Sequence, residues 1–336
     1  MAFRDSVGGT PGSSGDRVSH AGARTPPSPA RIRLVASVAV LTGALSLSIS
    51  AVLIKLAGVD APTTALLRCA IALLVLVPMA LLEARRRGRL SMRGILWSLA
   101  AGLALGIDYS AWTAAIYQVG AGISTVLVNV QVVVLPLLAL LIDRERIAVR
   151  FVIALPVMLV GLSLVGGLWE VDTLGPSAVT GTLLTMLAGV GYGVYMFLTR
   201  RGTRREPRLI DQPLMWATAS ATVTTTVAAP FTGGLHLTGI SARSWVLLAV
   251  LAVLGQVVAW VFINRGSAVL EPAATGALLL LQPILALGFA ALILAEHPTR
   301  LQLIGAVLVV IAVAVANGVV SWVLRDRRRR GRRSAT

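Results

Sequence analysis

Ten continuous apolar segments dominate the sequence, and each is long enough to cross a lipid bilayer as an α-helix. A helix rises 1.5 Å per residue, so about 20 apolar residues span the hydrocarbon core. The segments do not alternate polar and apolar residues, which excludes a transmembrane β-barrel. Only 13% of the residues are charged, about half the fraction found in soluble domains. The sequence therefore predicts an all-α integral membrane protein with ten transmembrane helices. They are expected at residues 34–56, 63–82, 94–116, 121–141, 148–168, 178–199, 212–231, 244–264, 271–294 and 300–323.

Two of these segments resemble each other without a gap. Gln131 and Glu145 in the first correspond to Gln282 and Glu296 in the second. Apolar matches carry little weight in so hydrophobic a chain, and coincidence between two membrane helices is the alternative explanation. The order of the surrounding segments repeats as well, which favours an internal duplication.

The duplication predicts two repeats, at residues 34–168 and 178–323. With five helices in each, the second repeat enters the membrane from the opposite side. Such inverted repeats are typical of secondary transporters, whose substrate site lies between the halves near the membrane midplane.

The basic residues indicate the orientation of the chain. The net charge is +16, and Lys55 is the only lysine. The arginines cluster before residue 34 and within 83–93, 142–150, 200–211 and 324–336, all on one side of the ten-helix arrangement. This asymmetry predicts a multi-pass protein of the cytoplasmic membrane with both termini in the cytoplasm. Residues 1–32 are expected to be a disordered tail, and residues 324–336 a basic tail that anchors the last helix at the membrane face rather than binding nucleic acid.

The order of the segments, together with several short motifs, resembles the EamA-like branch of the drug/metabolite transporter superfamily. The second repeat has Glu271-Pro272-Ala273-Ala274, then Gln282-Pro283 and Glu296. The first has Gly120-Ala121-Gly122, Asn129, Gln131 and Glu145, and Pro62 precedes Arg68 at the expected spacing. Val132 departs from the proline of the pattern, and Leu45-Ser46 from its Trp-Gly. The resemblance covers residues 34–323 and implies a small-molecule permease, often an exporter of amino acids, metabolites or drugs.

Asp108 is the only acid deep within a predicted span, and Arg68 lies at a similar depth on the preceding helix. An unpaired charge inside a membrane is costly, so the two are expected to face each other or to share a polar cavity. They could couple transport to a proton or cation, or they could form a purely structural pair. The sequence leaves both alternatives open.

Other polar side chains within the spans could line a pathway. Ser46 and Ser50 share a helix face, although hydroxyls in helices also bond back to their own backbone. The glycines of the third and sixth helices are better explained by close helix packing than by a gate. Glu145 and Glu296 end their helices, where they are expected to act as anchors. The predicted substrate or ion pathway comprises Asp108, Arg68, Tyr109, Trp112, Ser46, Ser50, Asn129, Gln131, Tyr192, Tyr195, Asn264 and Gln282.

The sequence offers little support for an enzyme. Its three histidines have no metal-ligand spacing, and the motifs H-E-x-x-H, G-x-S-x-G and G-x-x-x-x-G-K-[ST] do not occur. No catalytic residue, metal or cofactor is predicted. The expected function is alternating-access transport of a small metabolite, amino acid or drug, with membrane lipid and a coupling proton or cation as partners. A flippase for lipids or lipid-linked intermediates is the alternative on the same fold.

Overall fold

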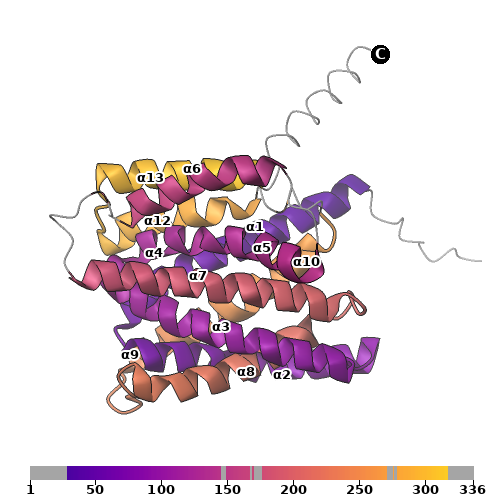
Figure 1. The fold of residues 1–336 in the computed structure, drawn as a ribbon. Helices are drawn as coiled ribbons and strands as arrows, with labels where there is room; N and C mark the ends of the chain where they lie inside the picture. Colours follow the sequence, from indigo (N-terminus) through magenta and orange to yellow (C-terminus); the bar gives the residue numbers. More distant parts are fainter. Residues whose placement is uncertain are drawn as a thin grey trace, which may run out of the picture.

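The structure is a computed structural model that describes residues 29–144, 149–166, 169, 176–270, 275 and 278–316. All regular elements among these residues are helices, which lie side by side in one bundle (Figure 1). The helices are α1 Pro29–Ala57, α2 Ala61–Arg87, α3 Met92–Val119, α4 Ala121–Leu127, α5 Gln131–Asp143, α6 Val149–Val165, α7 Pro176–Thr203, α8 Asp211–Ala228, α9 Ala242–Ala252, α10 Ala259–Ser267, α12 Leu281–Leu294 and α13 Arg300–Ala316.

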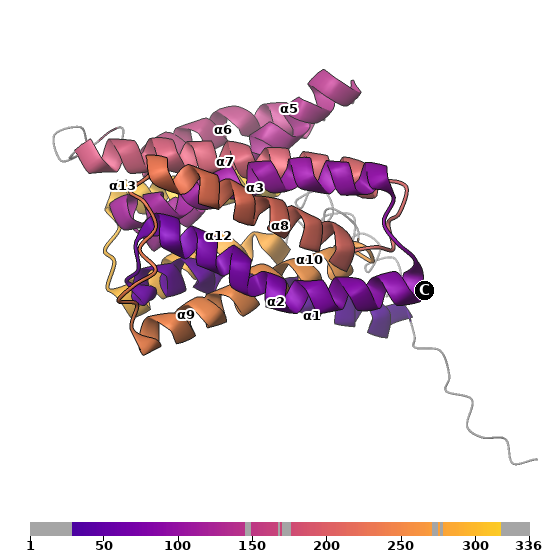
Figure 2. The same cartoon turned by 90° about the horizontal axis from the view of Figure 1, so that it is seen from below.

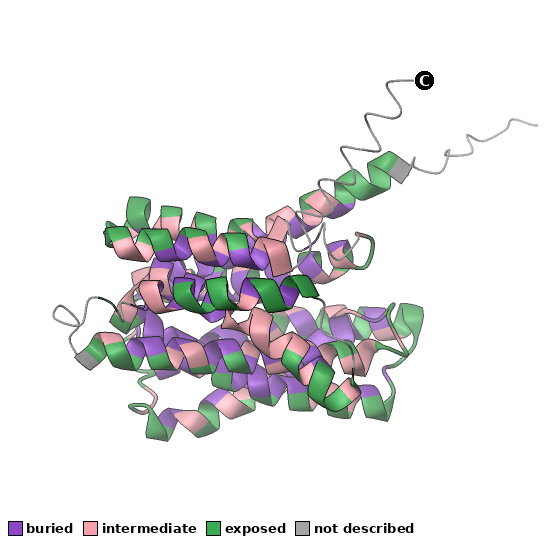
Figure 3. Cartoon of the chain, turned by 45° about the horizontal axis from the view of Figure 1, so that its top comes forward, coloured by how far each residue is buried: buried purple, intermediate pink, exposed green. Residues whose placement is uncertain are grey.

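The outer surface of the bundle is apolar. Leu74, Leu141, Val149 and Leu292 are each at least 74% exposed, and exposed residues cover the outward faces of the helices (Figure 3). Such a surface suits lipid, not water. Six of the described helices are long and apolar enough to cross a membrane: those at 30–57, 61–87, 92–119, 121–143, 177–203 and 242–267. α6, α12 and α13 are apolar but shorter in the described residues.

Two of the predicted helices are interrupted. A 3₁₀ turn at Val128–Val130 separates α4 from α5, and a π-helical turn at Val253–Val258 separates α9 from α10. Four others extend beyond the predicted spans at both ends: α1, α2, α3 and α7. The longest extensions are at the start of α1, which begins at Pro29, and at the end of α2, which continues through Arg87. Of the tail predicted at residues 1–32, residues 1–28 lie outside the described residues, whereas residues 29–32 are helical because α1 begins at Pro29. The predicted tail at 324–336, the end of the last predicted span at 317–323, Glu145 and the segment 271–274 also lie outside the described residues.

The packing of the helices follows a pseudo-two-fold pattern. α3 runs along α7, as both views show (Figure 1 and Figure 2), and α9–α10, the counterpart of α3 in the second half, runs along α1. α2 packs with its counterpart α8, and α6 with its counterpart α13. α5 packs against α7 as its counterpart α12 packs against α1, and α12 also contacts α4. The backbone repeats too. Arg144 and Ala295, at equivalent positions after α5 and α12, are the only non-glycine residues with positive φ in the described chain (55° and 53°). Both end a helix with a left-handed residue.

Gly102 lets α3 approach α8 closely, in line with the packing role expected of the helix-three glycines. A Cβ at Gly102 would lie 2.2 Å from the carbonyl oxygen of Ala217. We expect Gly102→Ala to lower the free energy of unfolding by about 1–3 kcal/mol, as overpacking does. Thermal unfolding of the purified protein measures the loss. Gly288→Ala is the matched control, because nothing lies within 4 Å of its added Cβ, and equal stability of the two variants would contradict the prediction.

Candidate functional site

Buried polar and aromatic side chains meet where the two halves of the bundle face each other. Tyr109 on α3 donates a short hydrogen bond to Oε1 of Gln256, in the π-helical turn. Trp260 on α10 donates from Nε1 to the Tyr109 hydroxyl at 3.2 Å. Nε2 of Gln256 in turn donates to Oγ1 of Thr218 on α8, at 2.9 Å. Tyr109 and Trp260 are 151 residues apart, the same offset that relates Gln131 to Gln282. Equivalent positions of the two halves therefore meet at this point.

Arg68 lies beside this hydrogen-bond chain and is fully buried. Its guanidinium carbon is 3.9 Å from the centroid of the Tyr109 ring, a cation–π contact. Its Nη2 donates to the carbonyl of Gly255 at 3.3 Å. Gly255 lies in the π-helical turn, a feature often found at functional sites. A Cβ at Gly255 would lie 2.4 Å from Oγ of Ser50 and 3.4 Å from Nη2 of Arg68. Only glycine allows these contacts.

Several buried polar atoms near this cluster have no hydrogen-bond partner among the described residues. They include Nε and Nη1 of Arg68, Nε1 of Trp112, Oγ1 of Thr113 and Oε1 of Gln131. Folded proteins satisfy almost all of their buried polar groups. A group of unpartnered atoms at the interface of the halves therefore marks a place where a ligand or water completes the structure.

Asp108 and Arg68 do not form the direct ion pair that was one of the two expected arrangements. No salt bridge within 4.0 Å joins them among the described residues, because Tyr109 and Gly255 take up the guanidinium. They remain close enough for the guanidinium to act electrostatically on the carboxyl. Asp108 is 5% exposed and packs against α7. A Cβ added to Gly191 of α7 would lie 3.2 Å from the Cβ of Asp108.

The aromatic candidates on α7 join the same cluster. The Tyr192 and Tyr195 rings lie edge-on to Trp260, with centroids 5.5 Å and 5.2 Å away. Tyr195 also lines a cavity of about 170 Å³, and Asn264 shares the wall of that cavity. Gln131 lies beside Tyr192. The fold thus brings together those predicted pathway residues that lie on α2, α3, α7 and α10.

The remaining candidates use their polar atoms locally. The Ser46 and Ser50 hydroxyls bond back to carbonyls of α1, at 2.8 Å each. Asn129 donates to the carbonyls of Thr125 and Val126 at 3.0 Å. Gln282 contributes its backbone carbonyl, which accepts from Ser48 at 3.0 Å. Of these, only Ser50 approaches the Arg68 cluster, through Gly255.

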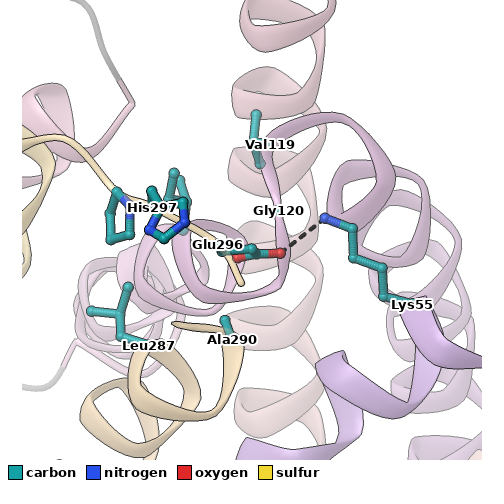
Figure 4. A pocket seen from close by; sticks show the side chains of 9 residues that line it. Lys55, Val119, Gly120, Leu287, Ala290, Glu296 and His297 are labelled. Atoms are coloured by element: carbon teal, nitrogen blue, oxygen red, sulfur yellow. Dashed lines mark hydrogen bonds and ion pairs between the residues drawn. The ribbon is translucent and has the colours of Figure 1, made fainter. Parts of the chain in front are cut away.

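Glu296 anchors one end of the bundle. Its Oε1 accepts from Nζ of Lys55 at 2.9 Å and from the Ala121 amide at 2.8 Å, and its Oε2 accepts from the Gly122 amide at 3.1 Å. Figure 4 shows the carboxylate between Lys55 and the start of α4. An anchoring role is what the sequence suggested for Glu296, although Lys55 was not foreseen as its partner.

A second ion pair lies at the opposite end of the bundle. Arg201, in the last turn of α7, contacts Asp143 at the end of α5 at 3.2 Å. α1 and α7 begin at opposite ends of the bundle, so these two pairs close opposite ends (Figure 1). The two pairs are equivalent in the two halves. Lys55 at the end of α1 meets Glu296 just after α12, and Arg201 near the end of α7 meets Asp143 at the end of α5.

Sequence reasoning missed two important polar residues. Gln256 lies within a predicted span, and its amide alone was the signal for it. Glu83 was assigned to a loop, but it is buried within α2 and its carboxylate accepts from the amides of Ile210, Asp211 and Gln212, each at 3.0 Å. It therefore caps the start of α8 from another helix.

Comparisons with known proteins agree with this architecture. A crystal structure titled only "Crystal structure of protein" resembles the chain with a TM-score of 0.58, covering 84% of this chain and 96% of the other. At 18% identity that likeness shows the fold alone. No curated protein matches the sequence. The sequence profile of the EamA-like transporter family matches twice, over residues 34–167 and 179–318, which supports the duplication. The chain is thus a multi-pass membrane protein that belongs to the EamA-like transporter family, within the drug/metabolite transporter superfamily.

Proposed function

We propose that the protein is a secondary transporter that moves a small organic solute across the cytoplasmic membrane by alternating access. The observation that carries the proposal is the set of unpartnered polar atoms buried between the two halves. In transporters built from inverted repeats, the substrate site lies at this interface, near the membrane midplane. Membership of a transporter family supports transport over catalysis.

The proposed topology has ten membrane spans in two inverted five-helix repeats, with both termini in the cytoplasm. The pseudo-two-fold packing of the helices supports the repeat. α1 begins and α13 ends at the same end of the bundle (Figure 1). Arg87, Arg201 and Arg208 lie at that end, where Arg87 bonds to the carbonyl of Arg208. A concentration of arginine at one end is typical of the cytoplasmic face.

Transport couples to a proton or cation through Asp108 in this proposal. Its carboxyl is buried and lies within electrostatic range of the Arg68 guanidinium. Among the described residues, no carboxylate lies within 4.0 Å of that guanidinium. A buried acid of this kind in a membrane protein is a candidate for ion relay. A solute or proton that changes the charge at Asp108 then changes the field at Arg68.

Reconstitution into liposomes tests the transport function. Vesicles with the protein are expected to accumulate solutes from a metabolite mixture, measured by mass spectrometry, faster than empty vesicles do. The same vesicles, loaded with a fluorescent phospholipid and quenched from outside, report lipid flipping. Solute uptake without lipid flipping supports the proposal, whereas lipid flipping alone assigns the fold to a flippase. If neither occurs in any applied gradient, the proposal is wrong.

A further inference from the structure

The unpartnered nitrogen atoms around Arg68 have a common chemical property. Nε and Nη1 of Arg68 and Nε1 of Trp112 lack partners among the described residues, and the guanidinium carbon lies 5.8 Å from the Trp112 ring centroid. Guanidinium and indole N–H groups donate hydrogen bonds and cannot accept them. A ligand that satisfies these atoms must therefore present acceptors, and a carboxylate presents two oxygens in one plane.

The local charge favours a ligand with a single negative charge. Arg68 is fully buried without an ion pair to any described residue, and an uncompensated buried charge is costly. One anion would balance it. Asp108 lies within electrostatic range of the guanidinium, so a dianion such as phosphate would meet one cation and a neighbouring acid. A monoanion meets less of that repulsion.

The surroundings of the guanidinium favour an organic ligand. The Tyr109 ring covers one face of the guanidinium, at 3.9 Å, and leaves its N–H edges available. The Trp112 ring centroid lies 5.8 Å from the guanidinium carbon. Trp260 bonds to the Tyr109 hydroxyl, and its ring meets the Tyr192 ring edge to face at 5.5 Å. Aromatic walls bind the apolar body of a ligand while a few polar groups fix its orientation.

We propose that Arg68 and Trp112 form the subsite for the carboxylate of a small monocarboxylate substrate with an apolar or aromatic body. This inference rests on the transport function proposed above and names its substrate class. The subsite is closed in this structure, since Arg68 is fully buried. The Trp260 ring contacts Tyr109, which covers the guanidinium, and Tyr195, which lines the cavity of about 170 Å³. Movement of this aromatic layer would join the cavity to the subsite.

Ligand-induced thermal stabilisation of the purified wild-type protein tests the substrate class without any variant. Phenylacetate and butyrate are the carboxylate probes, and phenylacetamide and butyramide are their neutral isosteres. We expect the carboxylates to raise the unfolding temperature in a saturable manner and the amides to have no effect. Equal effects of acid and amide overturn the inference. Stabilisation by sodium chloride or inorganic phosphate that equals that of the carboxylates overturns it too.

Variants test the residues. Trp112→Phe keeps an aromatic ring but removes the indole N–H donor. We expect carboxylates to bind at least about tenfold more weakly, as for a lost hydrogen bond to a charged group. Arg68→Gln should abolish the discrimination between acid and amide. Arg243→Gln, which removes an exposed arginine at the start of α9, should bind as the wild type does. Unchanged carboxylate binding by both core variants overturns the subsite. If Arg68→Gln does not fold, Trp112→Phe and the wild-type comparison still decide.

The liposome assay separates this inference from the proposed function. Vesicles that transport neutral or cationic solutes but not carboxylates leave the transporter standing and overturn the substrate class. Vesicles that transport no solute at all overturn the proposed function itself.

Discussion

Glu296→Ala is expected to destabilise the protein by about 2–4 kcal/mol, since it removes a charged helix cap and an ion pair together. α4 has no cap of its own, because the preceding residue is Gly120. The Glu296 carboxylate replaces that cap by accepting from the Ala121 and Gly122 amides, and it also binds Lys55. Its side chain is only 15% exposed, so water replaces these bonds incompletely.

Thermal unfolding in detergent measures the loss, and hydrogen exchange locates it. Exchange of the amides at the start of α4 should accelerate in Glu296→Ala, while that of α8 should not change. Glu206→Ala is the control, since its bonds to Ser91 are exposed and longer, at 3.1–3.3 Å. A Glu296→Ala protein as stable as Glu206→Ala would show that the cap contributes little.

Asp108→Asn is expected to abolish the pH dependence of transport while leaving the amount of folded protein unchanged. Asparagine has nearly the same shape, so the packing against Gly191 is kept, but it carries no titratable proton. The titratable and charged groups around Asp108 are Arg68 and Cys69 on α2, Tyr109 on α3, and Tyr192 and Tyr195 on α7. These neighbours are a guanidinium, a thiol and three phenols, so Asp108 is the only carboxyl in the group.

Uptake into liposomes at a series of pH values, with and without a proton gradient, checks this prediction. Glu206→Gln instead removes an acid whose bonds to Ser91 are exposed, and it should keep the pH response of the wild type. Full transport with an unchanged pH profile in Asp108→Asn would rule out coupling at this residue. A sharp fall in folded protein would instead identify Asp108 as part of the structure.

The helices and the repeat could be predicted from the sequence because each leaves a pattern along the chain: a long apolar run, or the same residues recurring at a fixed offset. Apolar runs of sufficient length predict helices, and the paired Gln and Glu residues indicated the duplication. The interruptions could not be predicted. Asn129 lies in the break at Val128–Val130, and Gly255 and Gln256 lie in the break at Val253–Val258. Glycine and polar residues also occur inside uninterrupted helices of this chain, such as Gly102 and Asp108 in α3, so the breaks depend on packing against other elements.

The candidate site was predictable only in part, for a similar reason. Asp108, Arg68 and Tyr109 stood out because polar groups in a membrane are costly. Trp260 resembled any aromatic residue of a membrane helix, and its role depends on meeting Tyr109 across the bundle. The bond between Arg68 and Gly255 joins residues 187 positions apart. No periodicity within a helix encodes such contacts.

The contact between Tyr109 and Trp260 has a consequence for the two halves as separate units. Residues on a two-fold axis of a homodimer meet their own copies. Two tryptophans in that position would offer two donors and no acceptor, because an indole N–H only donates. Fusion of the halves into one chain allows a donor to face an acceptor, so that the bonds run in one direction from Trp260 through Tyr109 to Gln256. The halves are therefore not interchangeable, and a dimer of the second half alone could not form this hydrogen bond.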